Sequence, residues 1–316
     1  MRGALLKPIL LAGVLAALVM AAPGGAEDES SEDTGVIAFA SNRTGSTDVW
    51  VMNPDGTNPV DLTPVPGADV WPAWSPDARR IVFTRGRGFL RELWVMNANG
   101  TNQMQLTTNV VADIAPSWSP DGERIAVVRF GADFNLDIWV IDAHGAGSEL
   151  RLTDSPGFDG GPTWSPDGRW IAFMSDREGN AVYKIRSDGS GRLKRLTPLD
   201  MKAGTPSWSR DGDEIAFSDN VCPTCGESDV WILELDDAEF TQVTDTAQNE
   251  LFPDWSPDDE RLVYERSEIV GDNVLLPDIF VVDADGGAPT NLTNSPGVFD
   301  AMPRWSPEAD EDEDDD

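Results

Sequence analysis

One short motif recurs along the 316-residue chain: an aromatic residue, then Ser-Pro-Asp-Gly or a close variant, then a short apolar run. A clear copy is WSPDGRWIAF at residues 164–173. The tryptophan of the motif returns at intervals of 44 to 50 residues, as Trp74, Trp118, Trp164, Trp208, Trp255 and Trp305. A sustained period of this length in a β-rich chain indicates the blades of a propeller.

Each repeat divides into four short segments that are typical of strands. In the second unit they are residues 72–75, 80–85, 93–97 and 104–107, runs rich in Trp, Ile and Val between turn residues. The Ser-Pro-Asp-Gly segment predicts a tight turn, because Pro presets φ and Gly accepts a positive φ. Beyond the first 26 residues no run has sustained helical periodicity, so the chain is predicted to be all-β.

The two ends of the repeat array complement each other. Residues 36–63 contain a second, third and fourth strand without a first, and residues 302–307 form a first strand alone. We therefore predict a six-bladed β-propeller over residues 36–307, made of four-stranded antiparallel blades and closed by a blade split between the N- and C-termini. Closure removes the exposed edges of an open array.

The terminal segments predict export. Arg2 and Lys7 precede an apolar run at residues 9–22, so residues 1–26 have the layout of a signal peptide, with an uncleaved anchor as the alternative. Residues 27–35 are expected to be an acidic linker and residues 308–316 a disordered acidic tail. The mature protein is expected to be secreted or periplasmic, without a membrane span after signal cleavage.

The formal net charge of −33 disfavours nucleic acid as a partner, because a phosphate backbone would be repelled. The same charge favours solubility, and it would attract cations or basic partners. The two cysteines, Cys222 and Cys225, predict a local disulfide in an exported protein. One such pair cannot complete a four-ligand zinc site.

Residues 162–185, PTWSPDGRWIAFMSDREGNAVYKI, with the following RLT at 195–197, resemble the repeat of TolB-type six-bladed propellers. Related blades occur in the propeller domains of prolyl-oligopeptidase-type enzymes. The resemblance spans residues 36–307 and implies, by analogy, an interaction role in the cell envelope. We expect the N-terminal α/β domain of the TolB family to be absent, because only residues 27–35 separate the signal from the propeller. No GxSxG motif of a hydrolase domain is present.

The loops of a meandering blade fall on two faces. Turns between strands one and two, and between strands three and four, lie on one face and are short; we call this the tight-turn face. The connections from strand two to three and between blades lie on the opposite face, the variable face. Because variable loops on a rigid scaffold often carry binding sites, the variable face is the predicted working face.

An acidic residue stands five positions before the motif tryptophan in five of six repeats: Asp69, Asp113, Asp159, Glu250 and Asp300. With the first strand innermost, these acids would form a partial ring at the channel mouth. Calcium, which takes six to eight oxygen ligands, would neutralise them, with Asp113 and Asp159 as metal ligands. A basic side chain of a partner would do the same. The structural alternative is pairing with Arg85, Arg129 and Arg266, which end the second strand.

The residues three positions before the tryptophan predict an apolar channel lining. Among them Trp71, Phe252 and Met302 are the candidate ligand contacts, and core packing is the alternative.

The leading hypothesis is an exported, monomeric, non-catalytic propeller that binds a protein or small ligand of the cell envelope, with a cation at the channel mouth as an option. The alternative is a carbohydrate-active enzyme, a lyase or glycosidase that uses carboxylates. The single histidine, His144, supports neither histidine-based metal catalysis nor a Ser-His-Asp triad. A calcium-dependent scaffold is the third hypothesis.

Overall fold

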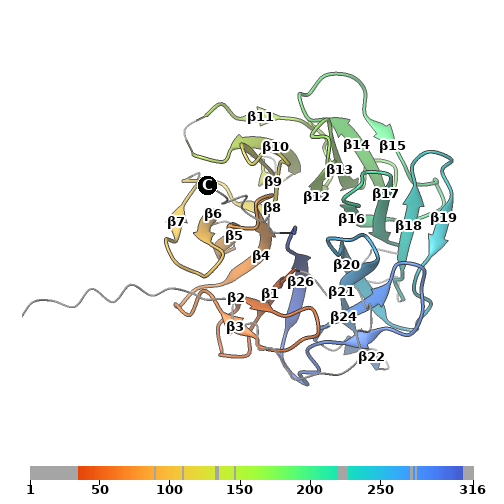
Figure 1. Cartoon of the computed structure of the whole chain (residues 1–316). Coiled ribbons are helices and arrows are strands. Elements are labelled where there is room, and N and C mark those ends of the chain that lie inside the picture. The colour runs from red at the N-terminus through yellow and green to blue at the C-terminus, as the bar shows by residue number, and fades with distance from the viewer. Residues whose placement is uncertain are drawn as a thin grey trace, which may run out of the picture. The chain divides into compact units, whose positions relative to one another are not determined.

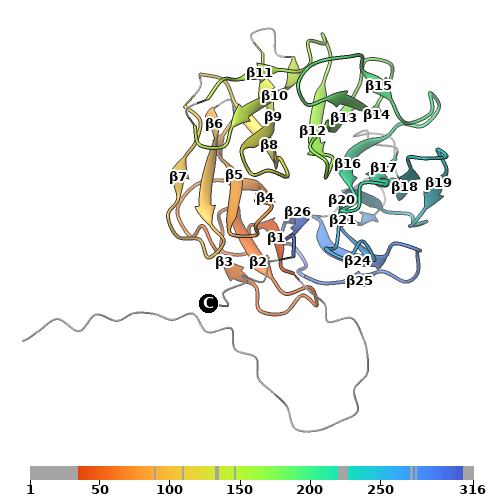
Figure 2. The ribbon, with the colours of Figure 1, turned by 45° about the horizontal axis from the view of Figure 1, so that its top comes forward.

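The computed structural model describes residues 35–308, except 89, 109, 132–134, 146, 220–226, 271–272 and 275. Within these residues, six four-stranded antiparallel sheets form a ring of blades, and no helix occurs. Figures 1 and 2 show the blades around a common centre. Accordingly, no helix of the described part is long and apolar enough to cross a membrane. The predicted all-β, six-bladed propeller is confirmed.

The blades are numbered along the ring, each from its innermost strand outward. Blade 1 contains β26 (Asp300–Trp305), β1 (Ile37–Ser41), β2 (Asp48–Met52) and β3 (Val60–Asp61). Blade 2 contains β4 (Asp69–Trp74), β5 (Arg80–Arg87), β6 (Leu90–Asn97) and β7 (Met104–Gln105). Blade 3 contains β8 (Asp113–Trp118), β9 (Arg124–Phe130), β10 (Leu136–Asp142) and β11 (Leu150–Arg151).

The other half of the ring has the same order. Blade 4 contains β12 (Asp159–Trp164), β13 (Trp170–Ser175), β14 (Ala181–Arg186) and β15 (Lys194–Arg195). Blade 5 contains β16 (Gly204–Trp208), β17 (Glu214–Ser218), β18 (Val230–Glu234) and β19 (Phe240–Gln242). Blade 6 contains β20 (Asn249–Trp255), β21 (Arg261–Ser267), β24 (Asp278–Asp283) and β25 (Thr290–Asn291).

The split blade closes the ring as predicted. The last strand, β26, pairs antiparallel with β1, with Trp305 opposite Ile37 and Asp300 opposite Ser41. Its neighbours in the adjoining blades include the innermost strands β20 and β4. Blade 1 therefore joins the two ends of the described chain.

The strand limits of blade 2 differ from the prediction. The innermost strand begins at Asp69, three residues earlier than expected, and the two middle strands are longer, at Arg80–Arg87 and Leu90–Asn97. The outermost strand is only two residues long. An outermost strand has one neighbour only, so few backbone hydrogen bonds hold it in register. In blade 6 the long loop between the second and third strands contains an additional hairpin, β22 (Ile269–Val270) with β23 (Asn273–Val274).

The hydrophobic core lies between blades rather than within them. One cluster joins Ile114 and Val128 of blade 3 to Ile171 and Phe173 of blade 4, all of them buried. Such clusters follow from the repeat, because a single blade cannot cover both of its own faces.

Every innermost strand carries a β-bulge at the same place. The pairing register shifts in each blade between the fourth residue before the motif tryptophan and the residue directly before it. The residue three positions before the tryptophan has φ of +49° to +60°, in the left-handed region: Trp71, Ala115, Gly161, Thr205, Phe252 and Met302. The bulge interrupts the two-residue alternation of side chains along the strand.

Candidate functional site

The five predicted ring acids are fully buried on the innermost strands. Each stands at the start of its strand or one residue after it, with 0% of its surface exposed: Asp69, Asp113, Asp159, Glu250 and Asp300. A buried carboxylate is costly unless it is paired. The groups around these acids therefore decide what they do.

Arginines from the second strand hold two of the acids. Arg85 donates two hydrogen bonds to Asp69, at 2.8 and 2.7 Å. Arg129 binds Asp113 in the same way, at 2.6 and 2.9 Å. Two-point contacts of this kind are the strong form of the arginine–carboxylate pair. Both pairs match the structural alternative drawn from the sequence.

Two further acids pair with arginines from a different position of the repeat, two residues further along the chain than the position of Arg85 and Arg129. Arg177 donates from Nη2 to both oxygens of Asp159, at 2.9 and 2.7 Å. Arg43 donates to Asp300 at 3.0 Å. In both blades the second-strand position of the arginine is taken by a serine that accepts a hydrogen bond from the arginine Nε. These serines are Ser175 and Ser41.

Glu250 differs from the four aspartates because its arginine lies beyond hydrogen-bond distance. Its Oε1 accepts a hydrogen bond from the Thr246 hydroxyl at 3.0 Å and lies 3.9 Å from Nε of Arg266. Its Oε2 has no hydrogen-bond partner among the described residues. Burial raises the pKa of Glu250 above its usual value, an effect that the Thr244 and Thr246 hydroxyls oppose.

Each of these guanidinium groups also lies over an aromatic ring of the third strand. The distances from the arginine Cζ to the ring centroid are 4.6 to 5.3 Å. The pairs are Arg43 with Trp50, Arg85 with Trp94, Arg129 with Trp139, Arg177 with Tyr183, and Arg266 with Phe280. Five blades thus share a buried acid, an arginine and an aromatic ring as one structural unit.

Blade 5 departs from this unit. Ala203 stands in the position of the acid, and Asp219 stands in the position of the second-strand arginine. Burial raises the pKa of Asp219, although its Oδ1 accepts a hydrogen bond from the Asp229 amide at 2.8 Å. Blade 5 therefore lacks both the ring acid and the arginine that would pair with it.

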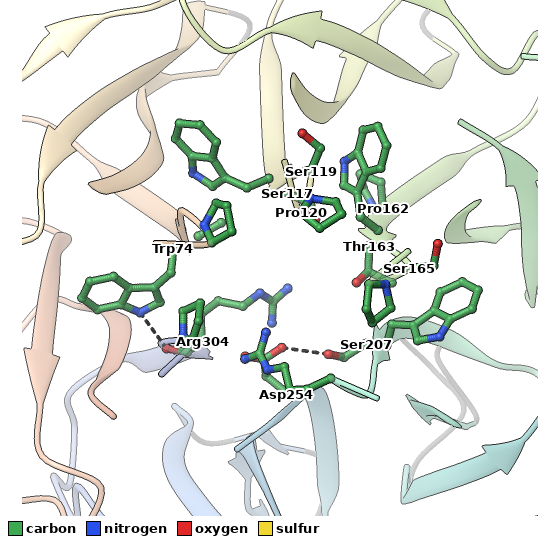
Figure 3. Close-up of a pocket in the computed structure, with 18 of the residues that line it drawn as sticks. Trp74, Ser117, Ser119, Pro120, Pro162, Thr163, Ser165, Ser207, Asp254 and Arg304 are labelled. Atoms are coloured by element: carbon green, nitrogen blue, oxygen red, sulfur yellow. Dashed lines mark hydrogen bonds and ion pairs between the residues drawn. The ribbon is translucent and has the colours of Figure 1, made fainter. Parts of the chain in front are cut away.

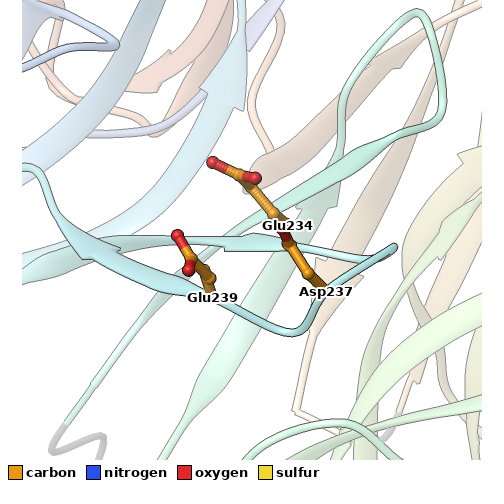
Figure 4. A group of neighbouring side chains, drawn as sticks. All are labelled: Glu234, Asp237 and Glu239. Carbon is orange, nitrogen blue, oxygen red and sulfur yellow. The ribbon is translucent and has the colours of Figure 1, made fainter.

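The ring acids do not gather around a shared point. Within the described residues, three carboxylates come within 4.8 Å of one another only at Glu234, Asp237 and Glu239, exposed side chains at the turn between β18 and β19 (Figure 4). A cation at Asp113 or Asp159 would have to displace the arginine bound there. Calcium at these residues stays a prediction.

The predicted apolar lining does come together at the centre of the ring. Trp71, Phe252 and Met302 are half-buried and line a narrow constriction with the other bulge residues. The free volume there is about 20 Å³. One water molecule needs about 10–15 Å³, so the constriction has room for little more than a single water.

A larger cavity opens on the tight-turn face, opposite the predicted working face. It holds about 260 Å³ and is lined by the Trp-Ser-Pro segments that end the innermost strands (Figure 3). We call this cavity the funnel. Its wall includes Pro116, Trp118, Pro162, Trp164 and Pro206.

The base of the funnel is formed by the six residues that directly precede the motif tryptophans: Ala73, Ser117, Thr163, Ser207, Asp254 and Arg304. Asp254 is buried, and both of its oxygens are used: Oδ1 accepts from the Ser207 hydroxyl at 2.8 Å, and Oδ2 from the Trp305 amide at 2.8 Å. Arg304 reaches into the middle of the funnel (Figure 3). It also lines the constriction, so it lies where the funnel narrows.

An aspartate of the tight turn directly follows several funnel-lining residues, such as Pro76, Pro120 and Pro166. We call the aspartates at this position of the turns the rim: Asp77, Asp121, Asp167, Asp211 and Asp258. In every turn one carboxylate oxygen accepts from the serine two residues earlier, at 2.5 to 2.7 Å. Burial alone would raise the pKa of Asp77, Asp121 and Asp167, but the serine hydroxyl and a backbone amide outweigh it and lower the pKa. Asp77, Asp121 and Asp167 are therefore ionised at neutral pH.

The repeated sequence of the blades matches a known family. A family model described as the TolB beta propeller domain matches residues 108–264, about half of the chain. The chain is a TolB-type β-propeller. No curated protein sequence matches it.

Solved structures share the fold. TolB from Acinetobacter baumannii is 24% identical, with a TM-score of 0.73 over 87% of this chain and 67% of that one. A candidate TolB from Agrobacterium tumefaciens is 22% identical, with a TM-score of 0.66 over 87% of this chain and 99% of that one. An oligogalacturonate lyase from Vibrio parahaemolyticus is 14% identical, with a TM-score of 0.54 over 80% and 73%. At these identities the likeness shows the fold alone.

Reasoning from the sequence missed the funnel of this TolB-type propeller. The sequence favours the variable face because its loops vary most, whereas the funnel lies among the short turns of the opposite face. The aligned repeats contain a signal for the funnel. The position directly before the motif tryptophan holds an acid in one repeat, Asp254, and an arginine in another, Arg304.

Two other predicted features lie apart from the funnel base. His144 is exposed on a tight turn, with Nε2 3.4 Å from Glu123. Cys222 and Cys225 lie outside the described residues, so their disulfide stays a prediction. The signal peptide at residues 1–26 and the tail beyond residue 308 also lie outside the described part.

Proposed function

We propose that this TolB-type propeller is an exported binding module, and that the funnel on its tight-turn face holds an extended peptide segment of a partner. The observation that carries the proposal is the funnel itself, about 260 Å³ in volume and lined by segments from all six blades. Concave sites with apolar walls and a few placed polar groups are typical of ligand-binding pockets.

The chemistry of the funnel favours a segment with basic side chains near the rim. Proline and tryptophan rings supply apolar wall surface, and the rim aspartates stand in the tight turns that follow the lining segments. The net charge of −33 adds a long-range attraction for cationic partners. Association should therefore weaken as salt is added.

Binding rather than catalysis is the better account of the funnel. Asp254 is the acid at its base, and both of its oxygens already accept hydrogen bonds within the protein. A glycosidase needs two available carboxyl groups at a defined separation. The lyase fold relative keeps the enzyme hypothesis as the second candidate, at lower weight because that likeness rests on the fold alone.

The N-terminal sequence supports the location that we propose for the module. The signal-like layout of residues 1–26 supports secretion to the periplasm or the outside of the cell. A monomeric protein of the cell envelope is the form we propose.

A matched pair of variants tests the funnel as the binding site. A random peptide pool is passed over the full chain, and retained peptides are re-measured on Ser117→Trp and on Leu199→Trp. Ser117 lies at the funnel base, whereas Leu199 is 78% exposed in a loop of the variable face. We expect Ser117→Trp to abolish binding at an unchanged melting temperature and Leu199→Trp to have no effect. Retention that survives Ser117→Trp but is lost in Leu199→Trp would move the site to the variable face.

A further inference from the structure

Arg304 is the group at the base of the funnel that has the most unused hydrogen-bonding capacity. Its one hydrogen bond to a described residue runs from Nη1 to the carbonyl oxygen of Pro303, at 3.0 Å. A guanidinium has five N–H donors. Figure 3 shows the side chain pointing into the middle of the funnel rather than toward the wall. Several donors of Arg304 are therefore free to bind a ligand.

The acid at the funnel base is already engaged within the protein. Each oxygen of Asp254 accepts one hydrogen bond, and its Oδ2 also lies 4.0 Å from Nη2 of Arg210, which lines the funnel too. A pocket around an arginine with free donors fits an anionic, planar acceptor such as a carboxylate.

The rim has the opposite charge. Its aspartates repel a ligand that is anionic throughout, and they attract cationic side chains. A ligand that suits both levels carries a carboxylate at its leading end and basic groups behind it.

The depth of the funnel indicates whether this carboxylate lies at the end of a chain or within it. Directly below Arg304 the channel narrows to the constriction of about 20 Å³, which Arg304 also lines. A peptide chain cannot continue through a space of that size. A segment that brings its carboxylate to Arg304 must therefore end there or turn back within 260 Å³.

We infer that the funnel receives the free C-terminal carboxylate of a partner polypeptide, bound by Arg304, with basic residues preceding it at the acidic rim. The inference rests on the proposed function and names the ligand end that the funnel recognises. Arg304 is a binding residue in this account, and the rim aspartates select the preceding residues.

The test compares two random octapeptide pools that differ only at the C-terminus, one with a free carboxyl group and one amidated. Each pool is passed over the full chain and over Arg304→Gln, and retained peptides are identified by mass spectrometry. We expect the free-acid pool to yield peptides rich in Lys and Arg. Their affinity should fall at least about tenfold on amidation, as expected for the loss of a charge-assisted pair.

Arg304→Gln provides the coupled control. In this variant the affinity for free-acid peptides should fall to the affinity for their amides, and the affinity for the amides should not change. The reason is that amidation and Arg304→Gln remove the same contact. Equal retention of both pools, with binding still lost in Ser117→Trp, would overturn the carboxylate inference and leave the proposed function standing. If the parent chain retains neither pool, the carboxylate inference and the proposed function are both wrong.

The acidic tail of the chain itself is the competing occupant, because Pro307 lines the funnel and Glu308 follows it. A chain that ends at residue 308 is therefore tested in parallel. Peptide retention that appears only after this truncation would show that the tail fills the funnel, and it would overturn the assignment to a partner.

Discussion

At the scale of single residues, an acidic side chain has a different role at each of two positions of the repeat. An acid five residues before the motif tryptophan is removed from water and held by arginine, as in Asp113 with Arg129. An acid in the Ser-Pro-Asp turn stays at the surface. Breaking a buried ion pair on one side leaves a charge without compensation, which costs far more than the pair itself contributes.

Replacement of Arg129 by methionine should therefore destabilise the protein strongly. The side chain of Arg129 is 7% exposed and its partner Asp113 is fully buried, so we expect a loss of about 3–5 kcal/mol in the free energy of unfolding. Urea unfolding followed by tryptophan fluorescence measures it. The double variant Asp113→Asn with Arg129→Met should recover part of the loss. Arg169→Met, at an exposed surface pair, should change the free energy by less than about 1 kcal/mol. Equal effects of Arg129→Met and Arg169→Met would contradict the structural role.

Glu265 on β21 is a buried acid that has no arginine bound to it in the way that the ring acids do. Its Oε2 accepts a hydrogen bond from the Met302 amide at 2.9 Å. Burial, opposed by that hydrogen bond and by the charge of Arg304, raises the pKa of Glu265 to about 7. The neutral form is thus favoured in the folded protein.

The pH dependence of stability should reveal this group. Between the ordinary glutamate pKa of 4.5 and about 7, the unfolded chain loses the proton while the folded protein keeps it. The contribution of Glu265 to stability is therefore complete below pH 4.5 and falls as the pH rises to about 7, by about 3 kcal/mol in total. Glu265→Gln keeps an oxygen for the Met302 amide and should lack this fall. The difference in free energy of unfolding between the variant and the parent, measured from pH 5 to 8, should grow with pH. A difference that stays constant, or that also appears in the exposed Glu260→Gln, would contradict the burial effect.

At the scale of elements, the bulge of each innermost strand decides which side chains meet at the centre. Strand positions followed from the tryptophan spacing and the turn residues, and the structure confirms them to within a few residues. The bulges could not be predicted, because strict two-residue alternation assigns the acids and the lining to one face of the strand. The arginine partners were predictable only where they end the second strand, as at Arg85, and not where a serine takes that place, as at Arg177.

The bulge also predicts the effect of a substitution at Gly161. Its φ is +60°, and a Cβ atom there would meet no atom closer than 3.9 Å, so the cost of alanine is conformational rather than steric. We expect Gly161→Ala to lower the free energy of unfolding by about 1–2 kcal/mol. Gly67→Ala serves as the control, because Gly67 lies outside the left-handed region. A Gly161→Ala protein as stable as the parent in chemical denaturation would mean that the bulge relaxes.

At the scale of the whole molecule, stability depends on closing the ring. Blade 1 is complete only when β26 pairs with β1, and the core clusters join neighbouring blades. Arg210, which replaces proline in its turn, donates to the carbonyl oxygens of Trp255 and Trp305 and so links blades 5, 6 and 1 on the tight-turn face. The closed ring was predictable from the split blade, whereas this link was not, since it depends on backbone atoms of other blades.

Removal of the closing strand should abolish cooperative folding. A chain that ends at residue 299 lacks β26 and leaves β1 with an exposed edge and an uncovered apolar face. We expect it to aggregate or to lose the single thermal transition of the parent, as followed by circular dichroism and size-exclusion chromatography. A chain that ends at residue 308 keeps β26 and should melt like the parent. A monomeric chain ending at 299 with an unchanged melt would show that the split blade does not close the ring.

The most direct test of the funnel as the binding site is fluorine NMR of protein labelled with 5-fluorotryptophan, titrated with a peptide retained in the selection. The chain has 12 tryptophans, and five of them line the funnel: Trp74, Trp118, Trp164, Trp208 and Trp305. Resonances are assigned by single Trp→Phe variants. The account predicts that signals of funnel tryptophans such as Trp118 and Trp164 shift on binding, while those of the third-strand tryptophans Trp50, Trp94 and Trp139 do not. Shifts confined to the third-strand tryptophans, beside the arginines of the variable face, would contradict it.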